Sequence, residues 1–435
     1  MSQVFADEDF ATVRHRITSI FGGSIGNLIE WYDFYIYNFF ALYFAKAFFP
    51  GSDPTVQLLN AFGIYALGFL IRPVGGWILG VYADRQGRRA ALTLSVTLMC
   101  LGSLMIALCP TYASIGIAAP LLLLLARLVQ GISLGGEYGT SATYLSEIAV
   151  SRHRGFYSSF QYVTLIGGQL LGSLTLLVMQ QRYSGAELEA WAWRVPFVIG
   201  ALCAVFGFWL RRNLKETDAF EKTKAQAGGK RVNLLAELIK HPREILLVFG
   251  LTMGGTTAFY TYTTYMPTFL VNTVKLTRDQ ATQISFITLL IYAALQPAFG
   301  AISDRIGRRP VLSFFGIAGT LLTVPMLTML SSTADYLTAM ALVMGALIVV
   351  SGYTSINAVV KAELFPAAVR ALGVGLPYAI AVSLFGGTAP YIALWFKDHG
   401  HESWFYWYVT ALIACSLLVY TTMRDTRHHS RIDRD

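Results

Sequence analysis

Long stretches without a charged residue recur along this chain of 435 residues, and each is about as long as a helix that crosses a membrane. In the second half, charges bound six such stretches, at 245–274, 280–303, 310–334, 336–360, 371–396 and 403–423. Because a spanning helix needs about 20 apolar residues, each stretch predicts one helix. The first half predicts six more, near 17–44, 56–83, 90–110, 117–146, 155–181 and 194–211. Residues 90–126 carry no charge and are too long for one crossing, so we expect a break at 109–116, where Pro110 lies.

Composition and charge agree with this pattern. The chain is 55% hydrophobic and only 13% charged, which is outside the range of ordinary soluble domains. Its net charge of +8 would suggest nucleic acid in a soluble protein, but here its distribution indicates topology. With the N-terminus inside and loops alternating, 25 of the 33 Lys and Arg lie on the side of both termini, 6 on the other side and 2 within the membrane. This asymmetry predicts cytoplasmic termini in a plasma (inner) membrane.

A repeated motif divides the chain into two related parts. The sequence GVYADRQGRR at 80–89 recurs as GAISDRIGRR at 300–309, an offset of 220. A Glu followed seven residues later by an Arg also occurs twice, at 147–154 and at 363–370. We therefore expect an all-α membrane protein with 12 transmembrane helices in two six-helix halves. The expected boundaries are 1–210 for the first half, 211–243 for a cytoplasmic connector and 244–435 for the second half with a short cytoplasmic tail.

The repeated motif resembles the G-x-x-x-D-R-x-G-R-R pattern of the major facilitator superfamily. GNLIEWYDFYIY at 26–37, RPVGG at 72–76, ARLVQGISLGGEYGTSATYLSE at 126–147 and KAELFPAAVRALGVG at 361–375 resemble its metabolite:proton symporter branch. Within it, the stretches 158–172 and 259–273 are most similar to members that carry α-ketoglutarate. The resemblance implies a monomeric symporter that imports a dicarboxylate with H⁺ by alternating access. It implies a small organic acid and the lipid bilayer as partners, with no cofactor and no nucleic acid.

Other functions remain open within and outside this branch. It also contains symporters for shikimate, for citrate and for zwitterionic osmolytes such as betaine and proline. The osmosensing members usually carry a long helical C-terminal extension, whereas this chain ends soon after its last predicted helix. An enzyme is not predicted, because all seven His fall in predicted loops or tails and no Walker A motif occurs. The four Cys lie singly, so we expect no metal site. A receptor would need a signalling domain, and a channel would need rings of charge.

Five charged residues are expected inside the membrane, and all lie in the first half: Glu30, Asp33, Arg72, Arg127 and Glu137. Such charges are costly unless they face a cavity or a partner. The spacing of Glu30 and Asp33 places them on one face of the first helix. The six uncharged runs of the second half led us to expect ionic chemistry in the first half alone.

These charges suggest how an anion and a proton could be bound together. Arg72 and Arg127 can each grip one carboxylate of a dicarboxylate through two N–H groups. Asp33, Glu30 or Glu137 would carry the proton, because three acids against two arginines leave one negative charge uncompensated. The simpler alternative is that each acid only neutralises an arginine. Tyr262, Tyr265, Gln161 and Asn357 are expected to add neutral substrate contacts, although membrane tyrosines often serve in packing or at the lipid interface.

The loops on the cytoplasmic side pair acids with arginines and are expected to act as a gate. The candidate gate residues are Asp84, Arg85, Gly87, Arg88, Arg89, Glu147, Arg154, Asp304, Arg308, Glu363 and Arg370. Ion pairs among them could hold these ends together and separate when the two halves rock. Gly87 and Gly307 would allow a tight turn. A topogenic signal alone would explain the arginines but not the matched acids.

Overall fold

The computed structural model describes part of the chain. Its backbone covers residues 10–51, 53–86, 88–135, 137–147, 149–212, 234–333, 335–367 and 369–433. Within these ranges, the side chains at 10–27, 80, 83–86, 88, 89, 91, 92, 137, 140, 204, 206–212 and 234 lie outside the description. Every regular element in the described ranges is a helix.

The first half is built from helices that follow the predicted runs, several of them broken into two pieces. They are α1 (Phe10–Phe48), α2 (Pro54–Leu70), α3 (Arg72–Gln86), α4 (Arg88–Leu108), α5 (Tyr112–Ile115), α6 (Ala118–Leu134), α7 (Glu137–Glu147), η1 (Ser151–His153), α8 (Arg154–Ser158), α9 (Phe160–Arg182), α10 (Gly185–Ala190), η2 (Ala192–Arg194) and α11 (Val195–Arg212). The expected break at 109–116 separates α4 from α6. The second run is interrupted at Ile71, directly before Arg72 and Pro73.

The second half repeats this plan. Its helices are α13 (Leu234–Ile239), α14 (Pro242–Phe259), η3 (Tyr260–Tyr265), α15 (Met266–Asn272), α16 (Arg278–Ile306), α17 (Arg308–Ser332), α18 (Tyr336–Thr354), α19 (Asn357–Leu364), α20 (Arg370–Ala381), η4 (Val382–Gly386), α21 (Ala389–Asp398) and α22 (Glu402–Thr422). The segments η3 and η4 are π-helices, which widen one turn of an otherwise α-helical span.

Local signals in the sequence explain where several of these helices begin and end. Asp53 caps α2 by accepting from the backbone N–H of Thr55, and Thr277 forms a capping box with Gln280 at the start of α16. Gly307 separates α16 from α17 with a φ of +101°, a conformation that side chains rarely adopt. The second copy of the repeated motif therefore turns at its glycine, as expected, whereas Gly87 of the first copy lies outside the described residues.

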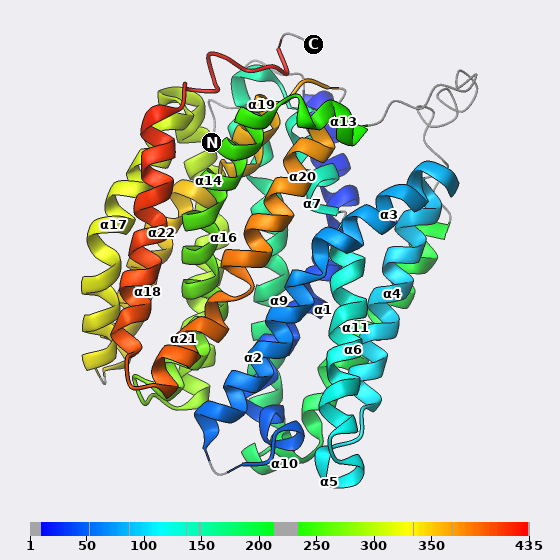
Figure 1. Cartoon of the computed structure of the whole chain (residues 1–435), viewed down its shortest axis with the longest axis vertical. Coiled ribbons are helices and arrows are strands. Elements are labelled where there is room, and N and C mark those ends of the chain that lie inside the picture. The colour runs from blue at the N-terminus through cyan, green and yellow to red at the C-terminus, as the bar shows by residue number, and fades with distance from the viewer. Residues whose placement is uncertain are drawn as a thin grey trace.

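The long helices run roughly along one direction, with those of the first half beside those of the second (Figure 1). The helix pairs that join the halves include α9 and α8 against α16, α7 against α20, and α2 against α21. The tail, defined here as residues 424–433, lies at one end of the bundle, and α5 and α10 lie at the other (Figure 1). We call these the tail end and the far end.

The lengths and hydropathy of the helices fit a membrane. Among the described residues, eight helical stretches are long and apolar enough to cross one, and the shorter apolar stretches Thr93–Leu108, Ala118–Leu134 and Ala192–Cys203 lie among them. Many large apolar side chains on the outside are exposed, such as Leu121, Leu321 and Leu418 at 58%, 67% and 67%. A bilayer would cover them, so the chain is a membrane protein.

Candidate functional site

The carboxylate of Asp33 lies fully buried inside the first half, on α1. Its Oδ2 accepts from the hydroxyl of Ser103 and from Nε2 of Gln130, the latter at 3.2 Å. Its Oδ1 has no hydrogen-bond partner among the described residues. Gly200 of α11 makes this position possible, because a Cβ there would lie 2.0 Å from that oxygen. Asp33 is thus a buried acid held by neutral donors, with one oxygen that no described group contacts by a hydrogen bond.

Gln130 links this acid to the first of the two arginines. While its amide nitrogen donates to Asp33, its Oε1 accepts from Nη1 of Arg127 at 2.8 Å. The simpler alternative, in which Asp33 only neutralises an arginine, would put the two groups in direct contact, but the described contacts place the amide of Gln130 between Asp33 and Arg127. Because one amide serves both groups, a change in the charge of Asp33 alters the hydrogen bonding of Arg127.

Arg72 and Arg127 both lie against the ring of Phe34. Their guanidinium carbons are 4.4 Å and 4.0 Å from its centroid. The guanidinium carbon of Arg72 also lies 3.6 Å from the ring centroid of Phe69, and that of Arg127 lies 4.5 Å from the ring centroid of Tyr37. Nε and Nη2 of both arginines are buried without a hydrogen-bond partner in the described part of the chain. These two atoms form the edge of the guanidinium that binds a carboxylate with two N–H groups, so each arginine presents an unused anion-binding edge.

Of the tyrosines on the first span of the second half, Tyr260 faces the arginines. Its ring meets Phe69 edge-on at 5.2 Å, and its hydroxyl lies 3.5 Å from that of Tyr35. The favoured Tyr262 and Tyr265 point elsewhere. Tyr262 lines a small cavity within the second half, beside Phe315 and Ile413 on α17 and α22.

Tyr265 stacks edge-on against Phe405 of α22. The structure therefore does not bring Tyr262 or Tyr265 together with Arg72 and Arg127. The three tyrosines of η3 are separated by two and three residues, and the π-helical turn sets which of them faces the other half. Hydrophobic periodicity along the chain does not predict this turn.

The remaining neutral candidates, Gln161 of α9 and Asn357 of α19, are both buried. Gln161 accepts from the hydroxyl of Ser141 at 2.5 Å, and its Nε2 has no partner among the described groups. Asn357 accepts through Oδ1 from Tyr138 at 2.7 Å, across the boundary between the halves. The same oxygen accepts from Nζ of Lys361 at 2.8 Å.

Lys361 corrects one expectation. We had expected buried ionic groups in the first half alone, yet Lys361 of α19 has an exposed fraction of 0%. The sequence interpretation treated it as a boundary charge at the end of an uncharged run. Since α19 extends from Asn357 to Leu364 and packs against α7 and α20, Lys361 lies within a helix and is enclosed rather than placed in a loop.

The other two candidate acids differ in what can be said of them. Glu30 is buried, with an exposed fraction of 2%. Glu137 begins α7, directly before Tyr138, but its side chain lies outside the described residues.

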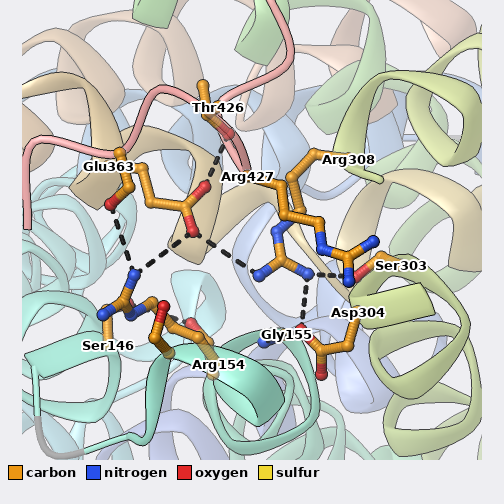
Figure 2. A network of polar contacts seen from close by, with 12 residues as sticks. Ser146, Arg154, Gly155, Ser303, Asp304, Arg308, Glu363, Thr426 and Arg427 are labelled. Atoms are coloured by element: carbon orange, nitrogen blue, oxygen red, sulfur yellow. Dashed lines mark hydrogen bonds and ion pairs between the residues drawn. The ribbon is translucent and has the colours of Figure 1, made fainter. Parts of the chain in front are cut away.

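At the tail end, Asp304 of the second half binds the first half through its backbone. Its two carboxylate oxygens accept from the N–H groups of Gly155 and Phe156, each at 2.8 Å (Figure 2). Arg308 donates to the same carboxylate at 2.8 Å. The contact is close, because a Cβ on Gly155 would lie 2.7 Å from the carbonyl oxygen of Gly300. The repeated motif of the second half thus holds the start of α8 against α16.

Glu363 is the centre of a second set of contacts beside the first. Its Oε1 lies 3.5 Å from Arg308 and 3.8 Å from Arg154, and its Oε2 accepts from Thr426 at 2.5 Å (Figure 2). Glu147 and Arg370 form an ion pair across the halves nearby. The side chains of Asp84, Arg85, Arg88 and Arg89, which would complete the first copy of this arrangement, lie outside the described residues together with Gly87.

Sequence reasoning missed the tail as a part of this set. Arg154 donates to Asp433 through both Nη atoms, at 2.7 Å and 3.1 Å, and Nη1 also donates to Ser430 at 3.3 Å. Asp425 accepts from the backbone N–H groups of Arg308 and Arg309 at 3.1 Å and 3.2 Å. The acids of the sequence RDTRHHSRID were a usable signal, because each stands among basic residues opposite the basic loops.

The two halves also touch at the far end. Arg278 pairs with Glu189 of α10 at 2.7 Å, and Gln180 donates to Thr282 at 3.0 Å. Contacts therefore hold the halves together on both sides of the arginines.

Comparison with known proteins agrees with this architecture. The family model described as "Sugar (and other) transporter" matches residues 20–227 and 211–432. The alpha-ketoglutarate permease of Escherichia coli (strain K12) is 50% identical over 420 residues, which is 96% of each chain. A citrate-proton symporter of Salmonella typhi is 36% identical, covering 92% of this chain and 91% of its own. A proline/betaine transporter of Salmonella typhimurium is 32% identical, covering 96% and 85%.

A solved structure gives the same fold. The crystal structure of a D-xylose-proton symporter superimposes with a TM-score of 0.75 over 95% of this chain and 98% of its own, at 18% identity. Together with the helices described above, this confirms the predicted twelve-helix fold class. The chain belongs to the sugar (and other) transporter family of the major facilitator superfamily.

Proposed function

We propose that the protein is a proton-coupled symporter that imports a dicarboxylate, with α-ketoglutarate as the leading candidate. The observation that carries the proposal is the pair of buried arginines around Phe34, each with an unused Nε and Nη2 edge. A buried, unpaired guanidinium is costly, and a carboxylate removes that cost by forming two charge-assisted hydrogen bonds. The 50% identity to an alpha-ketoglutarate permease supports the choice of substrate.

Asp33 is the proposed carrier of the proton. When Asp33 is protonated, the negative charge beside Arg127 is removed. Gln130 transmits this change through its hydrogen bonds to Asp33 and Arg127. Binding of a substrate anion and protonation of Asp33 would then favour each other. Protonation leaves the charge of Arg127 for the anion to balance, and the bound anion makes the negative charge of Asp33 unfavourable. Glu30 and Glu137 remain alternative carriers. Gln161 and Asn357 would orient the substrate, and Tyr260 takes the place that the sequence prediction gave to Tyr262 and Tyr265.

The tail end is the proposed cytoplasmic gate. The contacts of Asp304, Glu363 and Glu147 with the first half must break for that end to open. We place both termini in the cytoplasm and the chain in the inner membrane, with moving halves at 1–210 and 244–435 and a connector at 211–243. Asp84, Arg85, Gly87, Arg88 and Arg89 take the equivalent gate role in the first half. We propose a monomer without a cofactor.

Citrate is the second candidate substrate, supported by the relative named a citrate-proton symporter. Betaine or proline is supported by the relative named a proline/betaine transporter. Both arginines favour a substrate with more than one carboxylate, since a zwitterion would bring its own positive charge to an already positive site.

Uptake by proteoliposomes tests the proposal. Labelled 2-oxoglutarate is offered to the purified, reconstituted protein with and without an inward proton gradient, in competition with succinate, citrate, shikimate and betaine. We expect accumulation that requires the gradient and is inhibited best by dicarboxylates. Uptake that ignores the gradient overturns the coupling. Stronger inhibition by betaine or shikimate overturns the substrate.

A further inference from the structure

Lys361 lies at the boundary between the halves, and none of the side chains that the structure describes around it carries a negative charge. Its Nζ donates to Asn357 at 2.8 Å and lies 3.4 Å from the hydroxyl of Tyr138. Among the side chains that the structure describes, no carboxylate lies within ion-pair distance of it. Among the described groups, the ammonium therefore has neutral oxygen partners only, although its exposed fraction is 0%. Burying a lysine without an opposite charge costs several kcal/mol in most proteins, so such a residue calls for a functional explanation.

Two tyrosines form the walls around this ammonium. Nζ lies 4.0 Å from the ring centroid of Tyr378 and 5.1 Å from that of Tyr138. These rings stack on each other at 3.5 Å with an angle of 12° between their planes. Tyr138 belongs to α7 and Tyr378 to α20, so one ring comes from each half. The cation lies where the two halves touch, beside contacts that must separate when they rock.

The surroundings of Lys361 continue toward Arg72. The guanidinium carbon of Arg72 lies 3.6 Å from the ring centroid of Phe69, and that ring meets Tyr260 at 5.2 Å. Arg72 begins α3, which packs against α20, the helix that carries Tyr378. Arg72 is in the first half and Lys361 in the second. Arg72 and Lys361 thus lie on helices that each pack across the boundary between the halves, and neither has an anionic partner among the described side chains.

We propose that Lys361 binds one carboxylate of the substrate while Arg72 binds the other, so that a dicarboxylate connects the two halves. This rests on the proposed function, and it adds a second-half cation to the two arginines of the first. The substrate enters between Tyr138 and Tyr378 and replaces their direct stacking. Because a monocarboxylate can satisfy only one cation, Lys361 determines the preference for two carboxylates and favours the closed state only when both ends are bound.

The test compares two ligands that differ by one carboxylate. Proteoliposomes take up labelled 2-oxoglutarate while unlabelled succinate or butyrate competes. The inhibitory concentration of butyrate divided by that of succinate measures the preference for the second carboxylate. Lys361→Gln removes the charge but keeps a polar group for Asn357 and Tyr138, and the loss of an unpaired buried charge should not harm folding. We expect its KM for 2-oxoglutarate to rise about tenfold to a hundredfold, the range of a charge-assisted hydrogen bond. Succinate should inhibit less well and butyrate about as well as before, so the ratio of the butyrate to the succinate inhibitory concentration falls.

Two matched variants complete the design. Lys361→Arg keeps the charge and should retain most of the preference, whereas Lys240→Gln removes an exposed lysine and should behave as wild type. If Lys361→Gln is not recovered from the membrane, Lys361→Met is used in the same assay. A variant without the charge that keeps the wild-type ratio overturns the proposal, as does an equal loss for both competitors, which would indicate a structural role.

The wild-type protein separates this proposal from the proposed function. Gradient-dependent uptake of 2-oxoglutarate by the wild type bears on the function alone, and only the ratio measured in the variants bears on Lys361. If the wild type carries citrate instead, the dicarboxylate assignment fails, and Lys361→Gln must then weaken labelled citrate uptake by the same factor for this inference to stand. Transport of betaine alone would overturn both.

Discussion

Arg154 of α8 and Asp433 of the tail face each other with two hydrogen bonds, from Nη2 to Oδ1 at 2.7 Å and from Nη1 to Oδ2 at 3.1 Å. Arg154 belongs to the first half, whereas the tail follows the last helix of the second. A bidentate ion pair between an arginine and a carboxylate has a fixed geometry. The tail therefore crosses the boundary between the halves and is one of the contacts that hold the tail end closed.

Protonation of Asp433 should weaken this contact, and only in acid. The hydrogen bonds from Arg154 hold the pKa of Asp433 below its ordinary value. The stabilisation is therefore fully present above the pKa of an unfolded Asp, about 3.9, and is lost as the pH falls through the lower folded value. A spin label at His429→Cys, in a background without the native cysteines, should be immobile at neutral pH and become mobile only below about pH 4. Asp433→Asn should mobilise it at every pH, and a label unchanged in that variant would contradict the contact.

Glu147→Arg should impair transport, because it places two positive charges together across the halves at Arg370. The double variant Glu147→Arg, Arg370→Glu restores opposite charges and should recover part of the initial uptake rate. The carboxylate of Glu147 is partly exposed, so membrane insertion and thermal stability should change little. Equal loss in the single and double variants would show that the pair itself does not matter for the gate.

Asp33→Asn should uncouple transport from the proton gradient. The amide keeps a hydrogen-bonding group beside Ser103 and Gln130 but cannot take up or release a proton. We expect substrate exchange between two loaded compartments to continue while gradient-driven accumulation is lost. Asp53→Asn is the matched control, because it changes an exposed cap that Asn fills equally well. Accumulation that persists in Asp33→Asn would move the coupling role to Glu30 or Glu137.

Gly155→Ala should weaken closure of the tail end. The added methyl group would lie 2.4 Å from Nη1 of Arg308 and 2.7 Å from the carbonyl oxygen of Gly300, so α8 and α16 must move apart. Overpacking costs about 1–3 kcal/mol, which lowers the ratio of closed to open states by roughly fivefold to a hundredfold. Distance measurements between spin labels on the two halves should report the shift. Gly185→Ala, where nothing lies within 4 Å, should leave the distances unchanged.

Arg278→Gln at the far end should have a small effect. Its ion pair with Glu189 joins side chains that are 35% and 36% exposed, and exposed pairs contribute about 0–1 kcal/mol. Initial uptake rates should stay within about fivefold of wild type. A much larger loss would indicate that this pair controls opening of the far end.

The sequence by itself determined the spans, the repeat and the burial of four charged residues of the first half, Glu30, Asp33, Arg72 and Arg127. Runs of uncharged residues located the helices, because a helix in lipid must satisfy its backbone internally and needs a minimum apolar length. The spacing of Glu30 and Asp33 placed both on one buried face, since residues three apart share a side of a helix. These properties depend on neighbours along the chain.

Only the tertiary structure decided which groups meet. The π-helical turn of η3 aims Tyr260 at Phe69 and turns Tyr262 toward Phe315, a choice that hydrophobic periodicity does not encode. In the sequence, Lys361 is a charge at the end of an uncharged run, and only the packing of α7 and α20 around it shows that it is buried. Asp433 meets Arg154 across 279 positions of sequence. Such contacts form between groups that are remote along the chain, so burial and partner choice follow from how the helices pack and not from any local pattern.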